Sequence, residues 1–197
     1  MLDVHILVSD MTRREWVEKC LESVSDAAAQ AGFPVGVYVV PISDGTRGHI
    51  GRGRKQGYAL GAYPYVTNVD DDDWVDKNAF ALLARGLEKG PVAVTTQCEM
   101  HQNGLSQGVK PWRNLLRVFR RDVALSAPLE AWPVYDAPMM LAHADAIGRV
   151  EELECAPYHY RLHLSPHRQL MGAITAEMRQ RITALPSGIH LARVSHG

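Results

Sequence analysis

The sequence predicts an α/β fold, a single-domain Rossmann-like α/β/α sandwich with a mixed, mainly parallel central sheet. Short apolar segments with strand character alternate with segments of helical periodicity over the first part of the chain. The connections contain helices, which is typical of parallel strands joined by crossovers. With 197 residues, 46% of them hydrophobic, the chain is long enough to bury one sizeable core.

The first unit is a strand, a turn and a helix. Residues 4–8, VHILV, are a short apolar run that predicts a buried strand. In the following segment apolar side chains recur at intervals of three and four residues, which is helical spacing: Trp16, Cys20, Val24 and Ala27. Gly32 ends this helix.

The next units repeat the alternation. Residues 35–40, VGVYVV, predict a second strand, and the Gly- and Arg-rich segment 44–57 predicts a loop that leads into a short helix. Residues 63–69 predict a third strand, and residues 76–90 contain the next helix. Ligands of open α/β sheets bind outside the carboxyl ends of the strands. Three polar clusters lie at such ends: Ser9 and Asp10, Ser43 to Gly45, and Asp70 to Asp73.

The second half of the chain is more mixed. Four strands and one helix are expected there, in the order 92–98, 115–121, a helix from Ala137 to Ile147, 150–156 and 159–164. Residues 167–185 predict a closing amphipathic helix that packs on the sheet. Pro186 ends that helix, so residues 186–197 are expected to form a C-terminal tail.

Composition narrows the function classes. The 21 basic and 22 acidic side chains leave a formal charge of -1, which argues against a generally basic nucleic-acid-binding protein. The widely spaced Cys20, Cys98 and Cys155 suggest neither a disulfide framework nor a thiolate zinc site. No apolar run approaches the roughly 20 residues that span a bilayer. We therefore expect a cytoplasmic protein with no transmembrane segment.

The stretch NVDDDDWVD, residues 68–76, places four consecutive carboxylates after an apolar strand. Two unit charges about 5 Å apart repel by roughly 3 kcal/mol at an effective dielectric of about 20. A hard divalent cation with oxygen ligands, Mg²⁺ or Mn²⁺, would offset that cost and could bridge a carboxylate to substrate phosphates. Alternatively, Asp72 or Asp73 caps the following helix, which explains one or two of the carboxylates but not all four.

Three weaker signals leave alternatives open. The segment GHIGRGRKQG, with Arg54 and Lys55, fits one side of an anionic-ligand cleft or a solvated loop equally well. His159 and His163 lie four apart in a predicted strand and would share one face, either as metal ligands or as structural histidines. Asp136 stands just before a predicted helix, either as its cap or as a general base at the edge of the cleft.

Six segments, taken in order, resemble the family 2 glycosyltransferases, whose members have the glycosyltransferase A fold. VHILVSDMTRREWVEKCLESV, VYVVPISDGT and RKQGYALGAYPYVTNVDDDDWV resemble the family's opening strand and helix, its second strand with an acidic end, and its Asp-x-Asp motif. VFRRDVAL, VYDAPMML and APYHYRLH resemble the acceptor-side segment, the Glu-Asp motif and the Tyr-Arg-x-His segment. The resemblance runs from Val4 to His167.

The resemblance implies roles in donor binding. Ser9 and Asp44 would contact a uracil-type base and its ribose, with Arg54 near the base or the diphosphate. Asp70 would hold the ribose or the donor sugar, and Asp71 would shape the same loop.

The resemblance also implies which residues bind the metal ion and which acts as the catalytic base. Asp72 would bind the divalent cation, Mn²⁺ or Mg²⁺, that bridges the two phosphates, with His163 as a candidate further ligand. Asp73 would shape the loop and cap the next helix. Asp136 would be the catalytic base, taking the proton of an acceptor hydroxyl while that oxygen attacks the anomeric carbon with inversion.

Organisation and partners follow from the same resemblance. Residues 1–185 would be one catalytic domain, with a nucleotide-sugar-binding half (1–98) and an acceptor half (99–185). The donor would be a nucleotide-diphosphate sugar, expected to be UDP-linked, and a second subunit of a homodimer could complete the acceptor side. The acceptor stays open among a saccharide, a lipid-linked molecule, a protein and a modified nucleic acid. The rival hypotheses are a sugar-phosphate nucleotidyltransferase and a catalytically inactive nucleotide-sugar-binding module.

Overall fold

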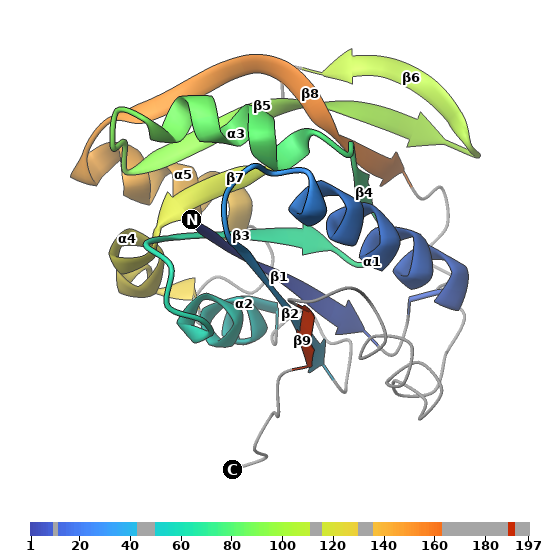
Figure 1. Ribbon diagram of the computed structural model, residues 1–197, viewed down its shortest axis with the longest axis horizontal. Coiled ribbons are helices and arrows are strands. Elements are labelled where there is room, and N and C mark those ends of the chain that lie inside the picture. Colours follow the sequence, from blue (N-terminus) through green and yellow to red (C-terminus); the bar gives the residue numbers. More distant parts are fainter. Residues whose placement is uncertain (10–11, 43–49, 111–115, 130–135, 163–188, 192–197) are drawn as a thin grey trace.

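The computed structural model describes residues 1–9, 12–42, 50–110, 116–129, 136–162 and 189–191 (Figure 1). The first half alternates strands and helices: β1 (Leu2–Ser9), α1 (Arg14–Ala29), β2 (Val35–Ile42), α2 (Ile50–Ala59), β3 (Tyr65–Asp70), β4 (Trp74–Val75) and α3 (Ala79–Leu87). The rest is richer in strands: β5 (Ala93–Gln102), β6 (Leu105–Lys110), β7 (Arg117–Arg120), α4 (Arg121–Ser126), α5 (Asp136–Ile147), β8 (Val150–Leu162) and β9 (Ile189–Leu191).

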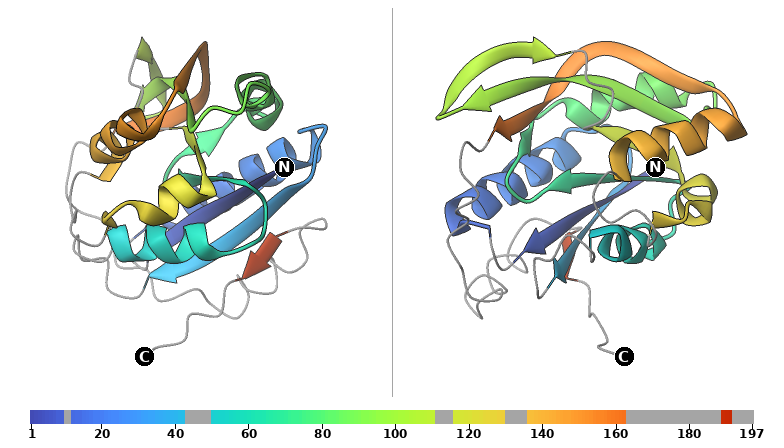
Figure 2. Two further views of the ribbon diagram at one scale, coloured as in Figure 1. Left: turned by 90° about the vertical axis from the view of Figure 1, so that its left-hand side faces the viewer. Right: turned by 180° about the vertical axis from the view of Figure 1, so that it is seen from behind.

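One mixed sheet crosses the molecule in the order β4-β8-β5-β7-β3-β1-β2-β9, with β6 paired to β5. β1 is parallel to both β2 and β3, β7 is antiparallel to β3 and β5, and β5 is parallel to β8. Helices α1 and α3 cover one face, and α2, α4 and α5 cover the other (Figure 2). The predicted α/β/α sandwich with a mixed sheet is therefore confirmed.

Each face of the sheet buries its own apolar layer. On the face under α1 and α3, side chains such as Leu21, Val24 and Leu83 pack against the strands. On the other face, Tyr58 of α2 and Met140 of α5 belong to a second cluster. Burying a side chain of this size contributes about 1.5–3 kcal/mol, so these two layers supply the main driving force for the sandwich.

Helix α2 lies unusually close to β1 because its glycines present no side chain to the sheet. A Cβ atom on Gly57 would lie 2.4 Å from Cδ2 of His5. The His5 ring is fully buried and meets Tyr58 edge-on, with the ring centroids 4.6 Å apart. Burial and the charge of Arg54 hold the pKa of His5 well below its usual range, so the ring is neutral in the fold.

Several local expectations were wrong. Most of the basic Gly-rich segment expected to be a loop belongs to α2, which begins at Ile50. The segment expected to form two strands from residue 150 is one continuous strand, β8. β4, β6 and α4 were not expected, and residues 189–191 of the expected tail form β9, parallel to β2. The helix expected at 167–185 lies outside the described residues.

The part of the chain that the structure describes contains no helix with both the length and the apolar composition needed to cross a membrane.

The close approach of α2 to β1 is testable by Gly57→Ala. The added methyl group overlaps the His5 ring, which is packed on all sides, so we expect the free energy of unfolding to fall by about 1–3 kcal/mol. Urea denaturation followed by circular dichroism measures the change. Gln56→Ala, at the exposed neighbouring position of the same helix, is the control and should change stability by less than about 0.5 kcal/mol. Equal stability of the two variants would contradict the packing described.

Candidate functional site

The aspartate run lies where two parallel strands end side by side. Asp70 is the last residue of β3 and is paired in register with Leu7 of β1, so Ser9 at the end of β1 lies next to the run. The N–H of Asp73 donates to the carbonyl oxygen of Asp70 at 3.1 Å and closes a tight turn into β4. The four carboxylates therefore occupy one turn at the carboxyl edge of the sheet.

Asp71 points back to the end of β1. Its Oδ2 accepts a hydrogen bond from the backbone N–H of Ser9 at 2.7 Å, and its side chain is buried. Burial and the neighbouring charge of Asp72 raise the pKa of Asp71 to about 7, while the hydrogen bonds from Ser9 and Thr12 oppose the rise. The residue ties the turn to the first strand.

Asp73 is the most deeply buried member of the run, with 1% of its surface exposed. Its Oδ2 accepts the hydroxyl proton of Tyr158 at 2.7 Å, and its Oδ1 accepts the backbone N–H of Arg161 at 2.7 Å. Burial, and next the charge of Asp72, raise the pKa of Asp73 well above its usual range. The expectation that Asp73 caps the next helix was wrong, because α3 begins only at Ala79 and Asp73 is bonded to β8 instead.

Tyr158 of β8 joins both ends of the turn. While its hydroxyl donates to Asp73, the same oxygen accepts the backbone N–H of Asp70 at 3.3 Å. The ring is 1% exposed, and burial together with the Asp73 charge raises the pKa of the phenol well above its usual range. The hydroxyl therefore keeps its proton and serves as a fixed bridge between the two aspartates.

Arg54 places a positive charge beside the turn. Its Nη2 donates to Oδ1 of Asp70 at 3.0 Å, and the Asn68 side-chain amide donates to the same oxygen at 3.3 Å. The Arg54 side chain is 7% exposed, whereas that of Asp70 is 35% exposed. The helix thus fixes one guanidinium at the carboxyl end of β3, next to the acidic residues.

Asp72 completes the turn and is half-buried. Its carbonyl oxygen accepts a hydrogen bond from Nε of Arg161 at 2.8 Å. Magnesium and manganese ions are commonly held in proteins by one or two carboxylates, with water and substrate phosphates as the remaining ligands. The carboxylate of Asp72 is partly exposed between two anchored aspartates, so its oxygen atoms suit such an ion.

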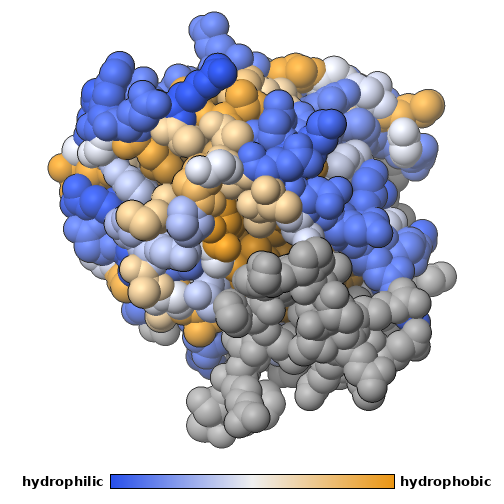
Figure 3. All heavy atoms as spheres, viewed as in Figure 1, coloured by the Kyte–Doolittle hydropathy of each residue, from blue (hydrophilic) through white to orange (hydrophobic). Residues whose placement is uncertain are grey.

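Cations and aromatic rings cover the space between the turn and α1. The Arg161 guanidinium lies 4.8 Å from the Trp16 ring centre and 5.0 Å from that of Trp74. The ammonium of Lys19 lies 3.3 Å from the Trp74 ring centre. Hydrophilic residues gather on this side of the molecule, over α1 (Figure 3). The rings of Trp16 and Trp74 therefore hold the charges of Arg161 and Lys19 close to the carboxylates.

The structure brings together five of the residues selected from the sequence: Ser9, Arg54, Asp70, Asp71 and Asp72. Asp136 is the first residue of α5, but its side chain is outside the described part of the chain. Asp44 and His163 also lie outside the described residues.

Sequence reasoning missed Tyr158 and the main-chain N–H of Arg161. The Tyr158 hydroxyl accepts the N–H of Asp70, 88 residues away in the sequence, and donates to Asp73. The N–H of Arg161 donates to Asp73, also across 88 residues. These contacts depend on the pairing of β8 with β4 beside the turn. No local pattern in the sequence predicts such long-range contacts.

Comparisons with known proteins support the fold alone. No protein-family model matches the chain, and no curated protein matches it. Among solved structures, S. aureus TarS aligns with a TM-score of 0.64 at 14% identity over 82% of this chain and 36% of that one. A shorter TarS structure in complex with UDP-GlcNAc aligns with the same TM-score and identity over 85% of this chain and 60% of that one.

A 4-diphosphocytidyl-2C-methyl-D-erythritol synthase from Anaerococcus prevotii aligns with a TM-score of 0.53 at 13% identity. That match covers 93% of this chain and 97% of the other, whereas this chain spans only 36% to 60% of the length of the TarS chains. The fold is therefore that of a glycosyltransferase A-like α/β sandwich.

The bridging role of Tyr158 is testable by Tyr158→Phe. The change removes the donor to a buried carboxylate and the acceptor of the Asp70 N–H, so we expect stability to fall by about 1–3 kcal/mol. Chemical denaturation at neutral pH measures it. In Tyr63→Phe the lost hydroxyl has no hydrogen bond to any residue that the structure describes, and this control should stay within about 0.5 kcal/mol of wild type. If Tyr158→Phe were as stable as the wild type, the bridging role of Tyr158 would be contradicted.

Proposed function

We propose that this chain transfers a sugar from a nucleotide-diphosphate sugar, UDP-linked by preference, to an acceptor hydroxyl. The observation that carries the proposal is the turn from Asp70 to Asp73 at the adjoining carboxyl ends of β1 and β3. Ligands of open α/β sheets bind at such ends. The fold is shared with TarS, which has been solved in complex with UDP-GlcNAc and with UDP.

The electrostatics of the turn support a bound cation. Burial and mutual repulsion raise the pKa values of Asp71 and Asp73, which means that the ionised forms are disfavoured as the turn stands. A divalent cation nearby lowers the free energy of the ionised carboxylates. Asp72 would hold Mn²⁺ or Mg²⁺, and His163 is a candidate second ligand. When bound, the ion would offset the negative charge that develops on the departing diphosphate.

The protein groups around the turn would bind and orient the donor. Ser9 and Asp44 would contact the base and its ribose, and Asp70 would contact the ribose or the sugar. The position of Ser9 beside Asp71 supports this arrangement. Arg54, held against Asp70, would place its charge near the base or the diphosphate. Fixing the donor in this way lowers the entropic part of the barrier to transfer.

The transfer step needs one proton acceptor. Asp136 would take the proton of the acceptor hydroxyl while the hydroxyl oxygen forms a bond to the anomeric carbon. The bond from that carbon to the β-phosphate oxygen breaks on the opposite face, and the nucleoside diphosphate leaves with its electron pair. The configuration at the anomeric carbon is thereby inverted.

One observation favours a second function. The synthase from Anaerococcus prevotii matches this chain over nearly the whole length of both proteins. A nucleotidyltransferase joins a sugar phosphate to a nucleoside triphosphate and releases pyrophosphate, whereas the proposed transferase releases a nucleoside diphosphate. Assaying both products after incubation with each substrate pair separates the two. Binding of a nucleotide sugar with neither product would indicate a binding module without catalysis.

Calorimetric titration with UDP and GDP, in the presence and absence of Mn²⁺, tests the donor site. We expect Mn²⁺-dependent binding of UDP that weakens at least tenfold in Asp72→Asn, because the lost charge contributes directly to holding the ion. Asp145→Asn removes an exposed carboxylate from α5 and should bind as wild type does. Binding of neither nucleotide, or binding that Asp72→Asn leaves unchanged, would contradict the proposed site.

A further inference from the structure

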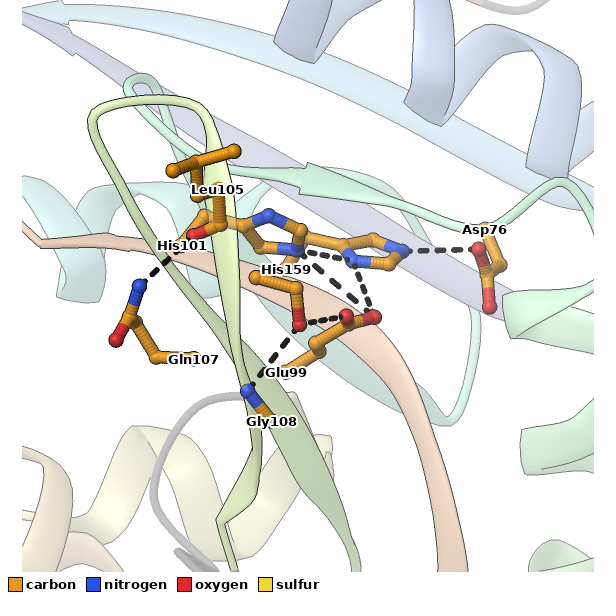
Figure 4. A network of polar contacts seen from close by, with 8 residues as sticks. Asp76, Glu99, His101, Leu105, Gln107, Gly108 and His159 are labelled. Carbon is orange, nitrogen blue, oxygen red and sulfur yellow. Dashed lines mark hydrogen bonds and ion pairs between the residues drawn. The ribbon is translucent and has the colours of Figure 1, made fainter.

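A second polar cluster lies on β5 and β8, beyond the aspartate turn. Glu99 and His101 are two residues apart on β5 and therefore point to the same face of the sheet. In the parallel pairing of these strands Glu99 lies opposite His159. The three side chains converge beside the β5–β6 hairpin (Figure 4).

Three potential ligand atoms meet in this cluster. Nε2 of His101 lies 3.0 Å from Nδ1 of His159. Oε2 of Glu99 lies 3.4 Å from the same Nδ1 and 3.8 Å from Nε2 of His101. A triangle with these sides has a circumscribed radius of about 2.0 Å, which is the usual length of zinc–nitrogen and zinc–oxygen bonds. One ion can therefore contact all three atoms without moving the backbone.

Neighbouring groups orient these atoms toward one point. Nε2 of His159 lies 2.9 Å from Oδ1 of Asp76, so that nitrogen carries the proton and Nδ1 keeps its lone pair. The hydroxyl of Ser106 donates to Oε1 of Glu99, which leaves Oε2 facing the imidazoles. Carboxylate partners on the far nitrogen of a histidine ligand are a regular feature of metal sites.

Trp74 fixes the two imidazole rings. Its ring is stacked on that of His159, with centroids 5.1 Å apart and an angle of 7° between the planes. The same ring lies against His101 with centroids 4.7 Å apart. The side chains of His101 and His159 are 14% and 13% exposed, so the cluster is held in place and still has a path to solvent.

Hydrogen bonding alone leaves one contact in this cluster unfavourable. If His159 donates Nε2–H to Asp76, its Nδ1 can only accept. Nε2–H of His101 can donate to that Nδ1 at 3.0 Å, but Oε2 of Glu99, a second acceptor, also lies 3.4 Å from it. Two acceptors at that distance repel, and a cation between them would make the contact favourable. A doubly protonated His159 would satisfy both carboxylates without a metal, and this is the arrangement that the experiment must distinguish.

We propose that Glu99, His101 and His159 form a transition-metal site that binds Zn²⁺ through Oε2, Nε2 and Nδ1, with the fourth position open to water or another ligand. Two imidazoles and one carboxylate form a donor set that suits Zn²⁺ and related late divalent ions, in contrast to the carboxylate-only aspartate turn. The site does not depend on the proposed sugar transfer, since it shares none of its ligands with the turn.

Titration of metal-free protein with Zn²⁺, followed by calorimetry, tests the site. We expect one equivalent to bind, and the affinity to fall at least tenfold in both His101→Gln and Glu99→Gln. Asp76→Asn removes only the group that orients His159 and should weaken binding by about 10–100-fold. In the X-ray absorption spectrum of the zinc-loaded wild type, imidazole scattering should correspond to two histidines, a measurement that requires no variant to fold.

Two controls separate this site from other zinc-binding groups. His143→Gln removes a histidine on α5 that contacts Ser126, away from the cluster, and should leave the affinity unchanged. Asp72→Asn should also leave it unchanged, whereas it weakens nucleotide binding if the donor site is correct. Absence of zinc binding to the wild type would overturn the proposal. Equal affinities for wild type, His101→Gln and Glu99→Gln would overturn it as well.

Discussion

The need to satisfy two buried carboxylates within one turn governs this architecture. Asp71 and Asp73 are removed from water next to Asp70 and Asp72, and each buried carboxylate requires hydrogen-bond donors to be tolerated. The donors come from distant parts of the chain: the main chain at the end of β1 for Asp71, and two groups of β8 for Asp73. The turn therefore ties the first strand to the longest one, and the partly exposed Asp70 and Asp72 are presented from a rigid base.

Periodicity in the sequence predicted the elements that bury an apolar face. β1, α1, β2, β3 and α3 lie close to their expected positions because their apolar side chains repeat with the period of a strand or a helix. β6 was missed because nearly all of its residues are exposed, so no buried alternation marks it. The first residues of α2 were expected to form a loop because glycine has low helix propensity, and here tight packing against His5 outweighs that preference. The break expected between the strands at 150–156 and 159–164 does not occur, because β8 is continuous from Val150 to Leu162.

The candidate site likewise contains residues that could be predicted from the sequence and residues that could not. Ser9 and the aspartates could be selected because they follow predicted strands, and Arg54 because it lies in a basic Gly-rich segment. The structure brings them together at one edge of the sheet. The contribution of Tyr158 could not be predicted, since it depends on which strand lies beside β4. The Glu99, His101 and His159 cluster depends likewise on the parallel register of β5 and β8. Long-range strand pairing, rather than local pattern, determines both.

The most direct test of the central claim is a crystal structure of the protein grown with UDP and Mn²⁺, with diffraction collected at a wavelength where manganese scatters anomalously. We expect an anomalous peak at the Asp72 carboxylate, with the diphosphate beside it and the nucleoside extending toward Ser9 at the end of β1. Nucleotide bound elsewhere, or a turn that carries neither manganese nor phosphate in well-defined density, would contradict it.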